Sequence, residues 1–182
     1  MPVTALLIWL APPRGRYDTL IFIGLLLSLA GDAFLALPGD RFMPGLIAFL
    51  TAHLCYIAAF LGESRELRLL RLVPYALWVG GLYLYLLPDL GAQAVPVGVY
   101  CVVITAMLWR AAALWQMAAV VGATLFGLSD SILALVRFRG GVPYGGALLI
   151  LAYWAGQTGI AFSTKRKFMS NRRRLGDGRP LM

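Results

Sequence analysis

The stretch "GDAFLAL", Gly31 to Leu37, places an aspartate inside a long apolar run, and "SDSILAL", Ser129 to Leu135, repeats that setting much later in the chain. Each stretch has a small residue, an aspartate, a small residue, a large apolar residue and then Leu-Ala-Leu. A charged side chain at the centre of a membrane helix costs about 3 kcal/mol on insertion. We therefore interpret Asp32 and Asp130 as functional residues inside a membrane.

The composition is typical of a membrane protein. The chain has 182 residues, of which 60% are hydrophobic and 13% are charged, and its mean hydropathy is +0.79. A soluble domain has about 25% charged residues. The two cysteines, Cys55 and Cys101, lie in apolar runs, and His53 is the single histidine. A disulfide framework and a zinc site built from several His and Cys are therefore disfavoured, and we expect no metal and no cofactor.

The apolar runs predict an all-α, polytopic transmembrane bundle. A helix needs about 20 apolar residues to cross a bilayer, and no run shows the alternation of a membrane β-strand. We expect about seven helices, the first of them incomplete, in a bundle over residues 1–163, followed by a basic cytoplasmic tail over residues 164–182. The runs are 2–11, 17–37, 42–61, 70–87, 94–108, 115–136 and 143–162.

The distribution of Lys and Arg predicts the orientation. Thirteen of the 16 basic residues would lie on the side of the C-terminus, and only Arg41, Arg137 and Arg139 would lie on the other side. Because cytoplasmic loops carry an excess of Lys and Arg, we expect a multi-pass protein of the cell (inner) membrane with a cytoplasmic C-terminus. The tail "KRKFMSNRRR" suits anionic lipid headgroups better than nucleic acid.

The position of each aspartate predicts that both face the bundle interior. Asp32 is expected five residues before the end of its helix and Asp130 six, at depths of about 8 and 9 Å. Small residues at helical spacing adjoin each aspartate, and such columns let helix backbones approach closely. We expect the two carboxyl groups in one layer, facing each other across a lipid-accessible cavity. The alternative is a protonated aspartate that only bonds a neighbouring helix. The columns are Gly24, Ser28 and Ala36, and Ala123, Gly127 and Ala134.

The two aspartate stretches also suggest an internal repeat. "RF" follows both, at 41–42 and 137–138, and the next apolar runs end in "IAAF" and "GIAF". Two helix pairs in the same orientation fit a parallel repeat about an axis along the membrane normal. The alternative is chance similarity in a chain rich in Leu and Ala.

Four stretches together resemble the YhhN-like family, the lysoplasmalogenases. They are "SLAGDAFLAL" at 28–37, the spaced residues Phe42, Gly45, Phe49, His53, Leu54 and Tyr56, "GATLFGLSDSILALVRF" at 122–138, and "YWAGQ" at 153–157. The resemblance covers nearly the whole chain except the basic tail. It implies an eight-helix bundle that hydrolyses the vinyl-ether bond of lysoplasmalogens to a fatty aldehyde and a glycerophospho-head.

The chain departs from the family pattern at two places. A Lys-Pro pair opens the second helix of family members, whereas Met1 precedes Pro2 here, so we expect the chain to lack the family's first helix and that lysine. Val136 stands where the family often has a polar residue.

Vinyl-ether hydrolysis suits a pair of aspartates. The bond is opened by a proton delivered to the β-carbon, and water captures the resulting oxocarbenium ion. One protonated and one ionised carboxyl group supply this chemistry, as in glycosidases. We predict Asp32 and Asp130 as the catalytic residues, without deciding which is the acid. The candidate substrate-binding residues are His53, Tyr56, Ser129, Arg137, Tyr153 and Gln157.

Two other classes of protein remain as alternatives. A proton-coupled transporter also uses intramembrane carboxylates and internal repeats, although broken helices are typical of that class. A non-catalytic receptor or scaffold would be expected to carry recognition chemistry in its loops, and these loops are short. The expected partners are a lysolipid substrate and membrane lipids, with no nucleic acid, and the sequence leaves the oligomeric state open.

Overall fold

The computed structural model describes residues 13, 15–114 and 116–176, with side chains described up to 164. This part of the chain is all helical, as predicted, and contains no strand. The expected first helix, 2–11, lies outside the described residues, so the count of seven stays a prediction. The long helices are α2 (Arg16–Ala36), α3 (Phe42–Glu63), α4 (Leu72–Leu90), α5 (Ala94–Ala113), α6 (Met117–Phe138) and α7 (Gly145–Gly176), and the short 3-10 helices are η1 (Leu69–Arg71) and η2 (Gly91–Gln93).

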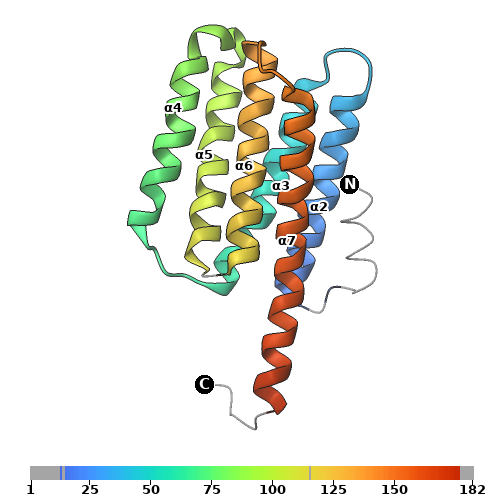
Figure 1. Ribbon diagram of the computed structural model, residues 1–182, viewed down its shortest axis with the longest axis vertical. Helices are drawn as coiled ribbons and strands as arrows, with labels where there is room; N and C mark the ends of the chain where they lie inside the picture. The colour runs from blue at the N-terminus through green and yellow to red at the C-terminus, as the bar shows by residue number, and fades with distance from the viewer. Residues whose placement is uncertain (1–12, 14, 115, 177–182) are drawn as a thin grey trace.

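Five stretches of the described residues are long and apolar enough to cross a membrane. Four of them coincide with α2, α3, α6 and the apolar part of α7, Gly145–Thr164. The remaining stretch has 45 residues, Leu69–Ala113, and contains α4 and α5, which fold back on each other through η2 (Figure 1). These stretches are those of a multi-pass membrane protein.

The helices lie side by side, so that alternate connections meet at the same end of the bundle (Figure 1). The α2–α3, α4–α5 and α6–α7 connections share one end, and α7 extends beyond the bundle at the other. The expected boundary between bundle and tail, at 163/164, falls within α7, which continues to Gly176. The α6–α7 connection begins at Gly140, where φ is +66° and the N–H donates to the carbonyl of Leu135. Glycine adopts this left-handed conformation at little cost and closes the helix.

Glycines bring the backbones of α6 and α7 into direct contact. A methyl group added to Gly122 would lie 2.5 Å from the backbone nitrogen of Ile160, and one added to Gly159 would lie 2.7 Å from Cα of Gly122. One added to Gly156 would lie 2.6 Å from the nitrogen of Phe126. Small residues of this kind drive helix association in membranes, where apolar lipid removes the hydrophobic driving force between helices.

The helix pair α2 and α3 packs differently, because aromatic side chains of α3 lie against glycines of α2. A methyl group on Gly24 would meet the ring of Tyr56 at 2.3 Å, and one on Gly31 would meet the ring of Phe49 at 2.7 Å. The expected column of small residues therefore does face the interior along Gly24 and the buried Ser28, whereas Ala36 is exposed at its end. The superposition of this pair on α6 and α7 stays a prediction.

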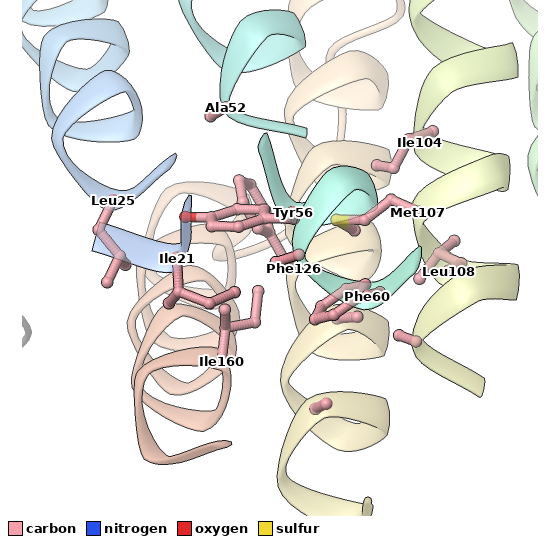
Figure 2. Packing of buried hydrophobic residues seen from close by; sticks show 14 of the residues in the cluster. Ile21, Leu25, Ala52, Tyr56, Phe60, Ile104, Met107, Leu108, Phe126 and Ile160 are labelled. Carbon is pink, nitrogen blue, oxygen red and sulfur yellow. The ribbon is translucent and has the colours of Figure 1, made fainter. Parts of the chain in front are cut away.

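The main apolar core lies among α2, α3, α5, α6 and α7, and α4 contributes the buried Val79 (Figure 2). Tyr56 and Phe126 are wholly buried near its centre, and large aliphatic side chains from the surrounding helices pack on them. The labelled residues in that figure are Ile21, Leu25, Ala52, Tyr56, Phe60, Ile104, Met107, Leu108, Phe126 and Ile160. Many leucines and valines on the outer faces of the helices are exposed, as lipid-facing positions require.

The contact between α6 and α7 generates a stability prediction. Gly159→Ala should lower the free energy of unfolding by about 1–3 kcal/mol, because its methyl group must push the two backbones apart. Gly81→Ala is the matched control, since a methyl group at Gly81 has no neighbouring atom within 4 Å. Thermal unfolding of the purified variants in detergent measures the difference. Equal melting temperatures for the two variants would contradict the close backbone contact.

The orientation of the bundle is a second prediction. In a background with Cys55→Ala and Cys101→Ala, a membrane-impermeant maleimide added to intact cells should label Arg139→Cys and not Arg65→Cys. The reason is the excess of Lys and Arg on the side of the chain that holds Arg65. Labelling of the 139 variant only after lysis would place the C-terminus outside.

Candidate active site

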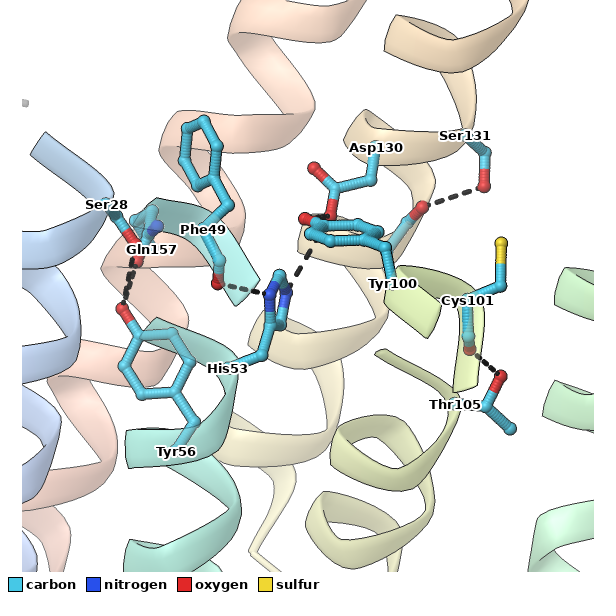
Figure 3. A network of polar contacts seen from close by, with 11 residues as sticks. Ser28, Phe49, His53, Tyr56, Tyr100, Cys101, Thr105, Asp130, Ser131 and Gln157 are labelled. Carbon is cyan, nitrogen blue, oxygen red and sulfur yellow. Dashed lines mark hydrogen bonds and ion pairs between the residues drawn. The ribbon is translucent and has the colours of Figure 1, made fainter. Parts of the chain in front are cut away.

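Asp130 is held at the junction of three helices. Its Oδ2 atom accepts a hydrogen bond of 2.6 Å from the hydroxyl of Tyr100 on α5. Nε2 of His53, on α3, lies 3.7 Å from the same oxygen. Figure 3 shows His53 between Phe49 and Asp130. The Asp130 side chain is 12% exposed, whereas His53 is wholly buried. The carboxyl group is therefore almost enclosed, with one hydroxyl donor and one imidazole beside it.

Aromatic rings fix the orientation of His53. Its ring packs edge-on against Tyr100, with centroids 5.2 Å apart, and tilted against Phe126 at 4.8 Å. Nδ1 lies 2.7 Å from the carbonyl oxygen of Phe49, one turn earlier on the same helix. These contacts hold the ring and one of its nitrogens, and the second nitrogen, Nε2, is the one that lies near Asp130.

Asp32, on α2, has its hydrogen-bond partner on the other helix pair, α6 and α7. Its Oδ2 atom accepts a hydrogen bond of 3.1 Å from the hydroxyl of Tyr153 on α7. The Tyr153 ring in turn packs against Phe126 and Phe49, at centroid distances of 5.4 and 6.0 Å. Asp32 is only partly buried.

A second polar group, formed by Ser28, Tyr56 and Gln157, ties α2, α3 and α7 together (Figure 3). The hydroxyl of Tyr56 donates to Oε1 of Gln157 at 2.9 Å. Oγ of Ser28 lies 3.4 Å from the same hydroxyl. All three side chains are wholly buried. The hydrogen bond between Tyr56 and Gln157 constrains helix position, because separating α3 from α7 would leave the Tyr56 hydroxyl and the Gln157 oxygen unsatisfied.

An apolar cavity opens on Asp130. Its volume is about 690 Å³, including the part that is open to the outside, and α3, α4, α5 and α6 supply most of its wall. Leucine, valine, isoleucine and phenylalanine side chains dominate the lining, and Asp130 is the one carboxyl group in it. Asp32 is not a lining residue. A cavity shared by both aspartates therefore stays a prediction, while the observed cavity belongs to Asp130.

Two ion pairs frame one end of this cavity. Arg137 contacts Asp40 at 2.6 Å, and Arg139 contacts Asp89 at 2.6 Å, while Phe138 between the two arginines lines the cavity. The backbone N–H of residue 42 and the Arg137 guanidinium hold the pKa of Asp40 below its usual value. The guanidinium carbon of Arg137 lies 5.3 Å from the ring centroid of Phe42, which lines the cavity, so Arg137 lies at the rim and not beside the carboxyl groups.

The structure brings together six of the eight residues proposed from the sequence. Ser129 is buried, but its hydroxyl is not among the polar contacts of either aspartate, and Arg137 is at the rim. The six that lie in the interior are Asp32, His53, Tyr56, Asp130, Tyr153 and Gln157.

The helix ends correct the expected depths of the aspartates. Asp32 lies four residues before the end of α2 and Asp130 eight before the end of α6, which corresponds to depths of about 6 and 12 Å. The estimate from sequence was wrong for Asp130 because α6 continues to Phe138, past the last apolar residue of its run.

Tyr100 is the site residue that sequence reasoning missed. It is the one tyrosine of α5, six residues into a helix that begins at the same end of the bundle as the carboxyl groups. The position of Tyr100 along α5 was the one feature of the sequence that could have indicated its place beside the carboxyl groups. Within the described residues, no three His, Cys, Asp or Glu side chains lie together as a metal site.

The sequence of this chain is similar to sequences of known proteins. The sequence model of the YhhN family matches residues 1–164. Lysoplasmalogenase TMEM86B of Homo sapiens is 37% identical over 173 residues, covering 91% of this chain and 73% of its own length. Lysoplasmalogenase TMEM86A of Bos taurus is 39% identical, with coverage of 80% and 65%. A lysoplasmalogenase of Mycobacterium bovis is 36% identical, with coverage of 80% and 59%. The chain thus spans about three fifths to three quarters of the length of these relatives. No solved structure matches.

The polar group around Tyr56 generates a further prediction. Tyr56→Phe should lower the free energy of unfolding by about 1–3 kcal/mol, because the buried Gln157 oxygen loses its hydrogen-bond donor. Tyr144→Phe, at a side chain that is 85% exposed, is the matched control and should leave stability unchanged. Thermal unfolding in detergent measures both. A Tyr56→Phe variant as stable as the control would show that this hydrogen bond does not tie α3 to α7.

Proposed function

This chain belongs to the YhhN family, and we propose that it is a membrane-embedded hydrolase of the vinyl-ether bond of lysoplasmalogen-type lysolipids. The products would be a fatty aldehyde and a glycerophospho-head. The relatives named above, which carry the name lysoplasmalogenase, support this proposal. The structural observation that carries it is the carboxyl group of Asp130 in the wall of an otherwise apolar cavity.

The cavity suits the apolar chain of such a lipid. Leucine, valine and phenylalanine side chains make up most of its wall. An alkenyl chain among its leucine and phenylalanine side chains would bring the vinyl ether, which joins chain and head, toward Asp130. The surrounding helix faces are apolar, so a lipid could enter from the bilayer without crossing water.

Two carboxyl groups supply the chemistry in this proposal. The carboxylic acid gives its proton to the β-carbon of the vinyl ether, and the C=C electron pair forms the new C–H bond. The ionised carboxylate stabilises the oxocarbenium ion and accepts a proton from the water that adds to it. The resulting hemiacetal then separates into an aldehyde and the alcohol of the head.

The remaining residues would position the reacting groups. The hydroxyl of Tyr153 orients the Asp32 carboxylate through its hydrogen bond. Tyr56 and Gln157 fix the helices that carry His53 and Tyr153. Ser129 precedes Asp130 on α6 and is buried outside the cavity lining, so we assign it no contact with the substrate.

Arg137 would bind the lipid head in this proposal. It stands at the rim of the cavity, where a phosphate could take the place of the Asp40 carboxylate on its guanidinium. We place the rim at the outer surface of the cell (inner) membrane and the basic tail in the cytoplasm, near anionic lipids.

A proton-coupled transporter is the second candidate. The contact of 3.7 Å between His53 and Asp130 inside the bundle favours it, because proton relays in membranes are built from such pairs. Turnover of a lysoplasmalogen by the purified chain distinguishes the two candidates.

The proposed function predicts the behaviour of aspartate variants. Asp32→Asn and Asp130→Asn should each lower turnover of a lysoplasmalogen in detergent by at least about 100-fold, because asparagine keeps the size but transfers no proton. The double variant should be no worse than the single ones, since the two groups act as a unit. His53→Ala and Tyr153→Phe should have smaller effects.

Glu66→Gln is the control for these variants, at an exposed carboxylate in the 64–68 connection at the other end of the bundle, and it should retain turnover. Near-normal turnover by either asparagine variant would remove that aspartate from the mechanism. A folded parent chain that turns over no lysoplasmalogen would contradict the proposed substrate.

A further inference from the structure

The hydrogen bonding of His53 fixes the position of one of its protons. Nδ1 lies 2.7 Å from the carbonyl oxygen of Phe49. A carbonyl oxygen can only accept a hydrogen bond, so Nδ1 must carry a hydrogen. In a neutral imidazole the other nitrogen, Nε2, then presents a lone pair.

That lone pair would face another acceptor. Nε2 is wholly buried, has no hydrogen-bond partner within the described residues, and points at Oδ2 of Asp130 across 3.7 Å. Tyr100 already gives its single hydroxyl proton to that same oxygen. An ionised Asp130 beside a neutral His53 would leave two acceptors opposed in an apolar interior, which is costly. One additional proton between the two groups turns this repulsion into a hydrogen bond.

We propose that His53 and Asp130 hold one proton in common and that this pair is the acid of the reaction, while Asp32 is the carboxylate. This assignment rests on the proposed function. It makes Asp130 a catalytic residue, because Asp130 gives the proton to the substrate. His53 is the positioning residue that holds the shared proton beside Asp130 until then.

The surroundings of the two aspartates separate their roles. Asp130 lines the apolar cavity and has the imidazole beside it, whereas Asp32 is outside the lining and accepts its hydrogen bond from Tyr153. The acid must touch the alkenyl carbon, and Asp130 is placed to do so. The carboxylate must meet water and a positive charge, which suits the more exposed Asp32.

The proton inventory closes over one turnover. The shared proton leaves the Asp130 oxygen for the β-carbon. Water adds to the oxocarbenium carbon and gives one proton to Asp32, which passes it to the departing ether oxygen as the head leaves as an alcohol. The hydroxyl proton of the hemiacetal returns to the Asp130–His53 pair as the aldehyde forms. The vinyl ether and one water thus become an aldehyde and an alcohol, and the pair is restored.

Titratable groups from each neighbouring helix act on this pair. Tyr100 from α5 donates to Asp130, Cys101 from α5 lines the same cavity, and Tyr56 lies one turn away from His53 on α3. Asp32 on α2 and Tyr153 on α7 are hydrogen-bonded to each other, and Asp32 is the second carboxyl group of the interior. Its variant is therefore the necessary control.

The single histidine makes a direct test practicable. The chain is labelled with ¹⁵N-histidine, purified with an affinity tag that contains no histidine, and placed in lipid nanodiscs. The ¹⁵N spectrum should show a proton on Nδ1 and, for Nε2, a signal displaced from that of a free lone pair. Asp130→Asn should restore the free lone-pair signal, whereas Asp32→Asn should keep the displaced one. An Nε2 signal that is the same in the parent and in Asp130→Asn at every pH would overturn the shared proton.

Kinetics link the shared proton to the reaction. Turnover should fall as pH rises over the range in which the Nε2 signal reports loss of that proton. His53→Gln should lower kcat about 10-fold or more and shift the pH at which turnover falls. A fall in turnover at a pH that does not match the change in the Nε2 signal would overturn the acid role of the pair. A displaced Nε2 signal in a chain without turnover would support the shared proton and reject the lysoplasmalogen substrate instead. Circular dichroism and thermal unfolding identify any variant that fails to fold.

Discussion

The hydrogen bond from Tyr100 to Asp130 is the interaction on which the interior of this bundle depends. A carboxyl group in an apolar environment needs partners within reach, and the Tyr100 hydroxyl is 2.6 Å away. His53 occupies the other side of the same oxygen. Because these three residues come from α5, α6 and α3, satisfying one carboxyl group fixes the relative position of three helices. The cavity lies where these helices and α4 leave room beside Asp130.

Glycines connect the second aspartate to that arrangement. Where Gly122 and Gly159 bring α6 against α7, Phe126 of α6 reaches the ring of Tyr153 on α7. Tyr153 then donates to Asp32 on α2. Each carboxyl group thus has a partner from the other helix pair, since Asp130 also faces His53 of α3. Helix packing therefore determines site geometry in this protein. A larger residue in the glycine contact would displace Tyr153, the hydrogen-bond donor to Asp32.

The sequence predicts the aspartates more readily than their partners. A carboxylate in an apolar run is conspicuous, because its burial is costly and needs a reason. Tyr100 is not conspicuous, since a tyrosine in such a run resembles Tyr83, whose hydroxyl donates to the backbone carbonyl of Ala94. Only the packing of α5 against α6 distinguishes the two. The cavity is likewise a property of four helices together and leaves no pattern within any one of them.

Helix ends were misjudged for a physical reason. The predicted run 94–108 ends just before Arg110, yet α5 continues to Ala113. The Arg110 side chain is 2% exposed and turns inward, where it donates to the backbone carbonyls of Ser64 and Glu66. An arginine that satisfies the carbonyls of a neighbouring loop can remain within a helix. Charge alone therefore marks the end of an apolar run and not the end of the helix.

The configuration of the aldehyde formed in deuterium oxide tests the central claim most directly, that a carboxyl group fixed in the bundle protonates the vinyl ether. The purified chain is given a lysoplasmalogen in deuterium oxide, and the aldehyde is reduced at once to an alcohol so that the label is retained. A fixed acid reaches only one face of the double bond, so the account predicts one deuterium on the carbon next to the former carbonyl, in a single configuration. An equal mixture of both configurations would show that the proton arrives from solvent, and it would contradict the account.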